Sequence, residues 1–221
     1  MILKIDSICI RRNKKILFDN LSLNLKKSQI LFLKGSNGIG KTSLLDAISG
    51  LLNPEKGEIY ITDYLSRNKK KLDKRSFFYL GHDFCLKDNL TVIENLIIWA
   101  KLCGKSATKK NIIQKLKYFK INNLINIPIY KLSQGQKRKV SLCKLLFDSR
   151  KIWILDEPTS GLDVSSTQNF LKLLKSHVRK EGSVIITSHI DLNIKPTHTI
   201  DLNKQKVKIK SQLNFKTWNH L

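Results

Sequence analysis

The segment Gly35–Thr42 has the residue types and spacing of a phosphate-binding loop, G-x-x-x-x-G-K-[ST]. Its glycines let the backbone curl so that N–H groups face phosphate oxygens, and the helix that follows adds its positive end. Lys41 is expected to bridge the β- and γ-phosphates of a nucleotide, Thr42 to offer its hydroxyl to Mg²⁺, and Ser43 to reach another phosphate oxygen. The other expected contacts are Gly35, Ser36, Asn37, Gly38, Ile39 and Gly40.

Adjacent carboxylates, Asp156 and Glu157, follow the apolar run at residues 152–155. A buried strand that ends in acids beside a phosphate loop suits phosphoryl transfer, which needs positioned charge and an oriented water molecule. Asp156 is expected to hold the shell of the Mg²⁺ ion. Because successive strand residues point to different sides, we expect Glu157 to face the attacking water.

Three more segments accompany these motifs. Residues 132–136 read LSQGQ, residues 160–163 read SGLD, and His189 follows the apolar run SVIITS. With them, the chain resembles the nucleotide-binding domain of ABC transporters over essentially its full length. LSQGQ is similar to the LSGGQ signature of that family, SGLD to its D-loop, and His189 to its switch histidine. The resemblance implies an ATP-hydrolysing enzyme that uses ATP and Mg²⁺.

The resemblance also implies a mechanism. Copies of the chain pair head to tail and sandwich ATP between them. Ser133, Gly135 and Gln136 of one copy would contact the ATP bound by Lys41 of the other. Glu157 would polarise the attacking water, and His189 would contact the γ-phosphate.

One stretch narrows the resemblance further. Residues 77–96, FFYLGHDFCLKDNLTVIENL, are similar to the corresponding stretch in the ATP-binding subunits of haem exporters used in cytochrome c maturation. Membership of that group implies integral membrane subunits as partners, with haem handled by the complex rather than by this chain. The alternatives are the ATPase of another ABC importer or exporter, and a non-transport ABC ATPase that acts on ribosomes or DNA.

Besides Gln134 in the signature segment, two positions depart from the family pattern. Many ABC domains stack an aromatic side chain on adenine near residue 12, whereas this chain has Arg11 and Arg12. A guanidinium can stack on a base, so Arg12 is expected to take that role. The Q-loop glutamine is also missing, and Asp83 is predicted to replace it as an oxygen ligand of Mg²⁺.

The elements that position these residues alternate between strands and helices, which indicates an α/β fold. We expect one ABC ATPase domain over residues 1–221. It would have a P-loop NTPase (RecA-like) core, a small antiparallel β-subdomain near the N-terminus and an inserted α-helical subdomain at roughly 85–145. Residues 64–75 are expected to form a surface loop and residues 207–210 a strand. Trp99 and Phe119 are predicted to be core residues, and the aromatic cluster of Phe77, Phe78 and Phe84 to grip a partner.

The composition is strongly basic, with a formal net charge of +24. The excess is compatible with binding to nucleic acid or to an anionic membrane surface. Enrichment in lysine, asparagine and isoleucine favours codon bias as its cause, and no nucleic-acid partner is expected. No stretch reaches the ~20 apolar residues needed to span a bilayer. We therefore expect a peripheral protein on the ATP-side face of an inner membrane. The mitochondrial matrix side is favoured, and the cytoplasmic face of a bacterial inner membrane is the alternative.

Overall fold

The computed structural model describes residues 2–12, 15–62, 69–71, 76–189, 192 and 194–204, with only the backbone at 69–71. The predicted strand at residues 207–210 lies outside these ranges. The predicted loop at 64–75 contains a short strand, β5 (Lys69–Lys71), and its other residues lie outside these ranges as well.

A parallel sheet of five strands forms the centre of the structure, with the order β6-β7-β8-β3-β9. Four of its strands are mostly apolar, as expected for parallel strands that are covered on both faces, whereas the edge strand β9 is mostly polar. Side chains alternate between the faces: Phe77 and Ile152 pack toward one layer, whereas Phe78 and Trp153 pack toward the other. The strands are β3 (Ile30–Lys34), β6 (Phe77–Leu80), β7 (Ile152–Leu155), β8 (Ser183–Thr187) and β9 (His198–Asp201).

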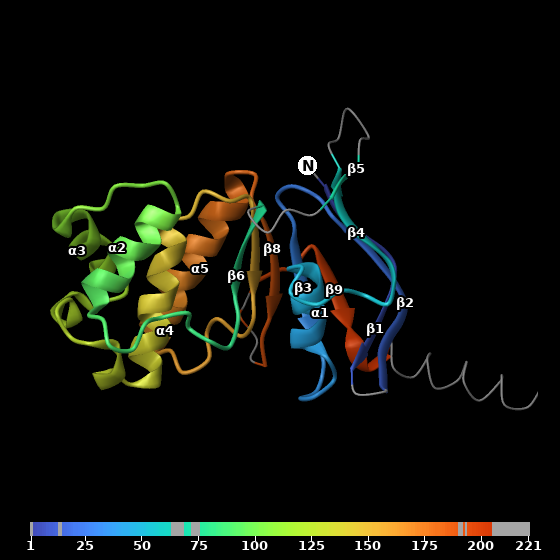
Figure 1. Cartoon of the computed structure of the whole chain (residues 1–221), viewed down its shortest axis with the longest axis horizontal. Helices are drawn as coiled ribbons and strands as arrows, with labels where there is room; N and C mark the ends of the chain where they lie inside the picture. The colour runs from blue at the N-terminus through green and yellow to red at the C-terminus, as the bar shows by residue number, and fades with distance from the viewer. Residues whose placement is uncertain are drawn as a thin grey trace, which may run out of the picture.

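One face of this sheet is covered by α1 (Lys41–Ile48), which lies between the parallel sheet and a second, antiparallel sheet (Figure 1). The second sheet has the order β2-β1-β4-β5. Leu44, Leu45 and Ile48 of α1 join residues of both sheets in one buried cluster. The long strands of the second sheet are β1 (Ile2–Arg12), β2 (Lys15–Leu25) and β4 (Lys56–Thr62).

Helices cover the opposite face of the parallel sheet (Figure 1). They begin at defined caps: Thr91 and Ser133 each form a reciprocal capping box, with Glu94 and Gln136 respectively. Such boxes satisfy backbone N–H groups that a helix start leaves unpaired. The helices are α2 (Val92–Leu102), α3 (Lys109–Tyr118), α4 (Gln134–Cys143) and α5 (Val164–Arg179), with short 3₁₀ turns at Asn122–Leu124, Ile129–Lys131 and Lys144–Leu146.

The α/β fold class with a small antiparallel sheet is confirmed. Phe119 is fully buried and Trp99 packs partly buried against the same core, as predicted. The prediction that three aromatic side chains contact a partner was wrong for Phe77 and Phe78. Phe77 and Phe78 are only 4% and 1% exposed, because both lie in a strand that is covered on both faces. No helix among the described residues is long and apolar enough to cross a membrane.

His177 of α5 packs its ring against the parallel sheet. Its ring stacks on Trp153, with centroids 3.6 Å apart, and its Nε2 lies 3.2 Å from the Lys151 carbonyl oxygen. Gly182 accommodates the ring, since a Cβ there would lie 2.2 Å from His177 Nε2. Burial lowers the pKa of His177 to about 4.

We expect acid to weaken the fold through His177. An unfolded histidine has a pKa of about 6.5, so between pH 4 and about 6.5 the unfolded chain binds a proton that the folded chain rejects. The free energy of unfolding should therefore fall from pH 7 to pH 5 by more in the wild type than in His177→Gln. Urea titrations at both pH values measure this difference. His198→Gln, at an exposed histidine on β9, is the matched control. An identical pH dependence in wild type and His177→Gln would contradict the prediction.

Candidate functional site

The phosphate loop connects β3 to α1 and encloses the Lys41 ammonium. Lys41 Nζ donates to the carbonyl oxygens of Gly35, at 2.8 Å, and Ser36, at 3.2 Å. Gly40 has a φ of 113°, and a Cβ there would lie 3.1 Å from the Phe18 ring. A glycine is required at this position both for its backbone angle and for the close approach. The loop thus holds a cation at its centre, which suits an anionic ligand.

A pocket of about 550 Å³ opens over this loop. Its walls come from the antiparallel sheet, the loop, α1 and the ends of three parallel strands. Ligand sites in open α/β sheets lie at the carboxyl ends of strands, and this pocket has that position. It is lined by Arg12, Leu17, Asn37, Gly38, Gly40, Lys41, Thr42, Ser43, His82, Glu157 and His189.

Asp156 lies beneath the pocket with no exposed surface and is held by hydroxyl groups on both sides. The Thr42 hydroxyl donates to its Oδ2 at 2.8 Å, and the Thr187 hydroxyl donates to its Oδ1 at 2.6 Å. Hydroxyl and carboxylate oxygens are the donors that Mg²⁺ prefers, so this donor set fits the ion. The structure brings the predicted magnesium residues Thr42 and Asp156 into direct contact.

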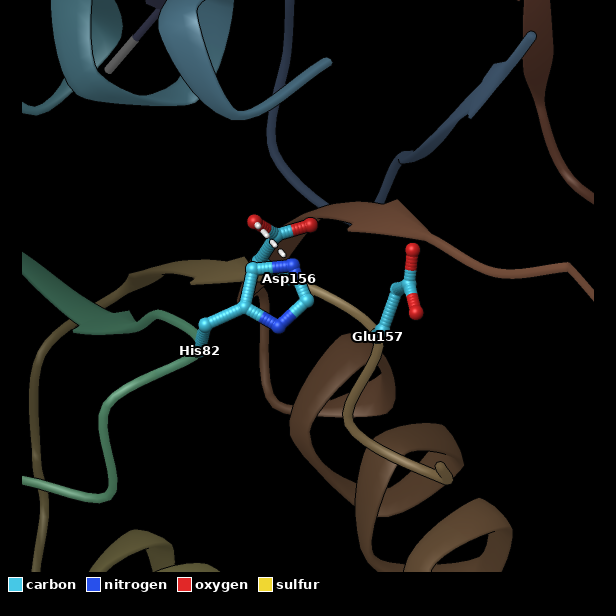
Figure 2. Close-up of side chains that lie close together, drawn as sticks. All are labelled: His82, Asp156 and Glu157. Carbon is cyan, nitrogen blue, oxygen red and sulfur yellow. Dashed lines mark ion pairs between the residues drawn. The ribbon is translucent and has the colours of Figure 1, made fainter. Parts of the chain in front are cut away.

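Glu157 leaves the strand in a different direction from Asp156 (Figure 2). Its φ of 48° lies in the left-handed region, which non-glycine residues adopt mainly where their surroundings enforce it. The Glu157 N–H donates to the Thr187 hydroxyl at 2.9 Å. Its Oε1 lies 2.5 Å from Nε2 of His189. The two residues predicted to be catalytic therefore form a pair at the wall of the pocket.

Thr187 was not predicted, although it positions both acids. In the sequence, the run SVIITSH predicts only the position of His189. The available signal was a hydroxyl residue in the last position of an otherwise apolar strand, next to the strand that carries the acids. A polar side chain buried there needs a partner of its own.

The residue beside Asp156 on the β6 side is His82, not Asp83 (Figure 2). His82 Nε2 lies 3.8 Å from Asp156 Oδ2. The strand register explains this placement: Leu80 pairs with Leu155, and the Asp156 N–H donates to the Leu80 carbonyl, so the chain just beyond Leu80 passes Asp156. Asp83 is exposed and lines a different hollow, so the structure does not bring it together with Thr42 and Asp156.

That second hollow, of about 590 Å³, lies where the loop after β6 meets the start of α4. Ser133 caps α4, and its hydroxyl accepts from the Gln136 N–H at 3.3 Å. A Cβ on Gly135 would lie 2.6 Å from the Gly161 carbonyl oxygen, so the signature and D-loop segments touch. Among the described residues that line the phosphate pocket, none comes from residues 132–136.

Arg12 reaches the phosphate pocket from the end of β1. Its Nη1 donates to the Ser43 hydroxyl at 3.2 Å. The predicted base-stacking residue and the predicted phosphate contact are therefore neighbours at one wall.

The loop after β6 is fastened to α4 by side chains that the sequence analysis did not identify. Lys144 is only 2% exposed, and its Nζ donates to the carbonyl oxygens of Phe84, at 2.7 Å, and Cys85, at 2.6 Å. The Ser141 hydroxyl also donates to the Phe84 carbonyl, at 3.1 Å. Burial lowers the pKa of Lys144 to about 8. Arg138 lies over the Phe84 ring, 4.8 Å from its centroid. We call these four contacts the α4 clamp.

Comparison with known families agrees with this geometry. The profile of the family described as ABC transporter matches residues 18–160, which include the phosphate loop and both acids. The chain belongs to the ABC transporter family. It is an ATP-hydrolysing domain of the transport type.

Individual proteins show how close the likeness is. The chain is 37% identical over 194 residues to the "Cytochrome c biogenesis ATP-binding export protein CcmA" of Brucella abortus (strain 2308), which covers 88% of each chain. A solved structure, a putative ABC transporter ATP-binding protein from Pyrococcus furiosus, superposes with a TM-score of 0.78 at 28% identity. That match covers 92% of this chain and 98% of the other. An ATP-binding cassette solved as a dimer with ADP and Pi shares the fold, with a TM-score of 0.75 at 24% identity over 90% of this chain and 93% of that one.

Replacing Thr187 by valine should impair turnover more than nucleotide binding. Valine keeps the shape but leaves the Glu157 N–H unpaired and removes a hydrogen bond from Asp156. We expect kcat for ATP to fall on the order of 10–100-fold, the range seen when outer partners of a site are removed. KM should change little, because the loop and Lys41 are untouched. Steady-state kinetics of Thr187→Val and of the rescue variant Thr187→Ser make the test. A wild-type kcat in Thr187→Val would show that Thr187 does not position the acids.

Proposed function

We propose that this chain is the ATP-hydrolysing subunit of a membrane complex for cytochrome c biogenesis, as the name of the Brucella relative describes for that protein. The observation that carries the proposal is one pocket in which Lys41, Thr42 and Glu157 meet. Similarity to the export protein over most of both chains supports the cytochrome c assignment.

Within the pocket, the proposed roles follow from the contacts. The loop amides and Lys41 bind the β- and γ-phosphates, and Arg12 lies where it can stack on the base. Thr42 and Asp156 would hold Mg²⁺, which when bound supplies positive charge to the phosphate oxygens. Glu157 orients the attacking water, and His189 holds the Glu157 carboxylate and reaches toward the γ-phosphate. The chain's contribution is positioning and charge, which is what phosphoryl transfer needs.

The separation of the signature from the phosphate pocket supports action as a pair. Ser133, Gly135 and Gln136 belong to the start of α4, next to the second hollow. A helix start presents N–H groups and attracts anions. We propose that these residues contact ATP bound by a second copy in a head-to-tail homodimer. ATP would then join the copies, and hydrolysis would release them.

The proposed partners are integral membrane subunits, with haem handled by the complex and not by this chain. The protein would lie on the ATP-side face of an inner membrane, in the mitochondrial matrix or in the bacterial cytoplasm. An ABC importer or another exporter would use the same ATPase chemistry. Identifying the membrane subunits that bind this chain therefore distinguishes these alternatives from the cytochrome c complex.

Two substitutions should separate binding from hydrolysis. Lys41→Ala removes the central cation, so we expect loss of ATP binding in equilibrium dialysis. Glu157→Gln keeps the shape but removes the base, so ATP should bind while kcat falls by at least about 100-fold. The Glu157→Gln protein should form an ATP-dependent dimer that light scattering detects. Normal ATP affinity in Lys41→Ala, or unchanged turnover in Glu157→Gln, would refute the corresponding role.

Co-purification should identify the complex. A tagged chain, isolated from gently solubilised membranes of its source, should bring integral membrane subunits and haem absorbance in the same eluate. The Lys41→Ala variant, purified in parallel, controls for capture that does not depend on ATP. Recovery of a different permease without haem would retain the ATPase and remove the cytochrome c assignment. Recovery of ribosomes or DNA, released by salt, would replace the transport role altogether.

A further inference from the structure

One nitrogen donor lies among the oxygen donors of the metal side of the pocket. An imidazole nitrogen of His82 and carboxylate oxygens of Asp156 and Glu157 all lie within 4.8 Å of one another. The imidazole points at the Asp156 carboxylate, whereas Glu157 approaches from the opposite side (Figure 2). Asp156 Oδ2 also accepts from Thr42, so His82 converges on the same oxygen as the hydroxyl predicted to hold the ion.

The position of His82 is fixed from both directions along the chain. Upstream, β6 pairs with β7 as far as Leu80 and Leu155. Downstream, the α4 clamp holds the backbone at Phe84 and Cys85. Arg138 Nη1 also donates to the Gly81 carbonyl oxygen at 3.4 Å. Only a short connection remains between these anchors, so the backbone that carries His82 is held beside the pocket.

The distance between His82 and Asp156 leaves the imidazole nitrogen free to bind a cation. His82 Nε2 and Asp156 Oδ2 are 3.8 Å apart, which is beyond hydrogen-bond range, so no direct hydrogen bond joins the two atoms. His82 is exposed toward the pocket, which it lines together with Lys41 and Thr42. An imidazole nitrogen and a carboxylate oxygen facing one space are a donor pair for a divalent cation.

The type of donor sets the type of ion. Mg²⁺ selects oxygen ligands and gives up its water reluctantly, whereas the first-row transition-metal ions accept nitrogen ligands more readily, and Mn²⁺ is the member of that series whose oxygen preference is nearest to that of Mg²⁺. We propose that His82 is a direct nitrogen ligand of the nucleotide-bound cation, and that it shifts the preference of the site from Mg²⁺ toward Mn²⁺. This inference rests on the proposed function, because the ion enters with the nucleotide.

Pulsed electron paramagnetic resonance of bound Mn²⁺ tests the ligand directly. The full chain is loaded with Mn²⁺ and unlabelled ADP, once as ordinary protein and once as ¹⁵N-labelled protein. We expect a nitrogen coupling that changes from ¹⁴N to ¹⁵N with the protein label, which excludes the adenine as its source. In His82→Gln, which offers an amide oxygen instead, the coupling should disappear while Mn²⁺ and ADP remain bound.

Competition between the ions gives a second readout. The ratio of Mn²⁺ to Mg²⁺ affinity, measured in the presence of ADP, should fall about tenfold in His82→Gln, which corresponds to about 1.4 kcal/mol. Asp83→Asn alters the neighbouring side chain, and His198→Gln removes an exposed histidine elsewhere. Both should keep the nitrogen coupling and the wild-type ratio.

Each outcome has one reading. A Mn²⁺–ADP complex without nitrogen coupling in the wild type, or with the coupling retained in His82→Gln, would overturn the assignment of His82 and leave the proposed function intact. Failure of the wild type to bind ADP with either ion would overturn the proposed function, and this inference with it.

Discussion

A carboxylate with no exposed surface is the constraint around which the site is built. Removing a charge from water is costly unless hydrogen bonds replace the lost solvation. Asp156 obtains these bonds from Thr42 at the start of α1 and from Thr187 at the end of β8. Three segments far apart in the sequence must therefore meet at one point. The phosphate loop is aligned with the acidic strand through this contact, and the same hydroxyl of Thr187 also sets the backbone of Glu157.

Residues that act through local spacing could be predicted from the sequence. The phosphate loop carries its own glycines, cation and helix within one short segment. Asp156 and Glu157 follow a strand whose apolar run is unmistakable. The α/β class follows from the alternation of buried strands with amphipathic helices.

Residues that act across space could not be predicted in this way. Choosing His82 over Asp83 requires the register between β6 and β7, and a shift of one residue in an extended segment reverses the direction of a side chain. Thr187 and Lys144 are defined by partners on other elements. The aromatic cluster failed for a related reason, because Phe77 and Phe78 are adjacent in a strand and each is buried by a different layer. The apolar sequence of β6, FFYL, is itself typical of a parallel strand that is covered on both faces, and that pattern outweighs the expectation of exposed aromatic side chains.

The α4 clamp links two regions that the fold otherwise separates. The buried ammonium of Lys144 would lose both of its carbonyl acceptors if the loop after β6 moved away from the end of α4. That loss would leave a buried ammonium unpaired, which costs free energy. The loop carries His82, which lies beside Asp156, and α4 begins after Ser133. A tilt of α4 against the parallel sheet would therefore have either to break these bonds or to displace the loop that borders the phosphate pocket.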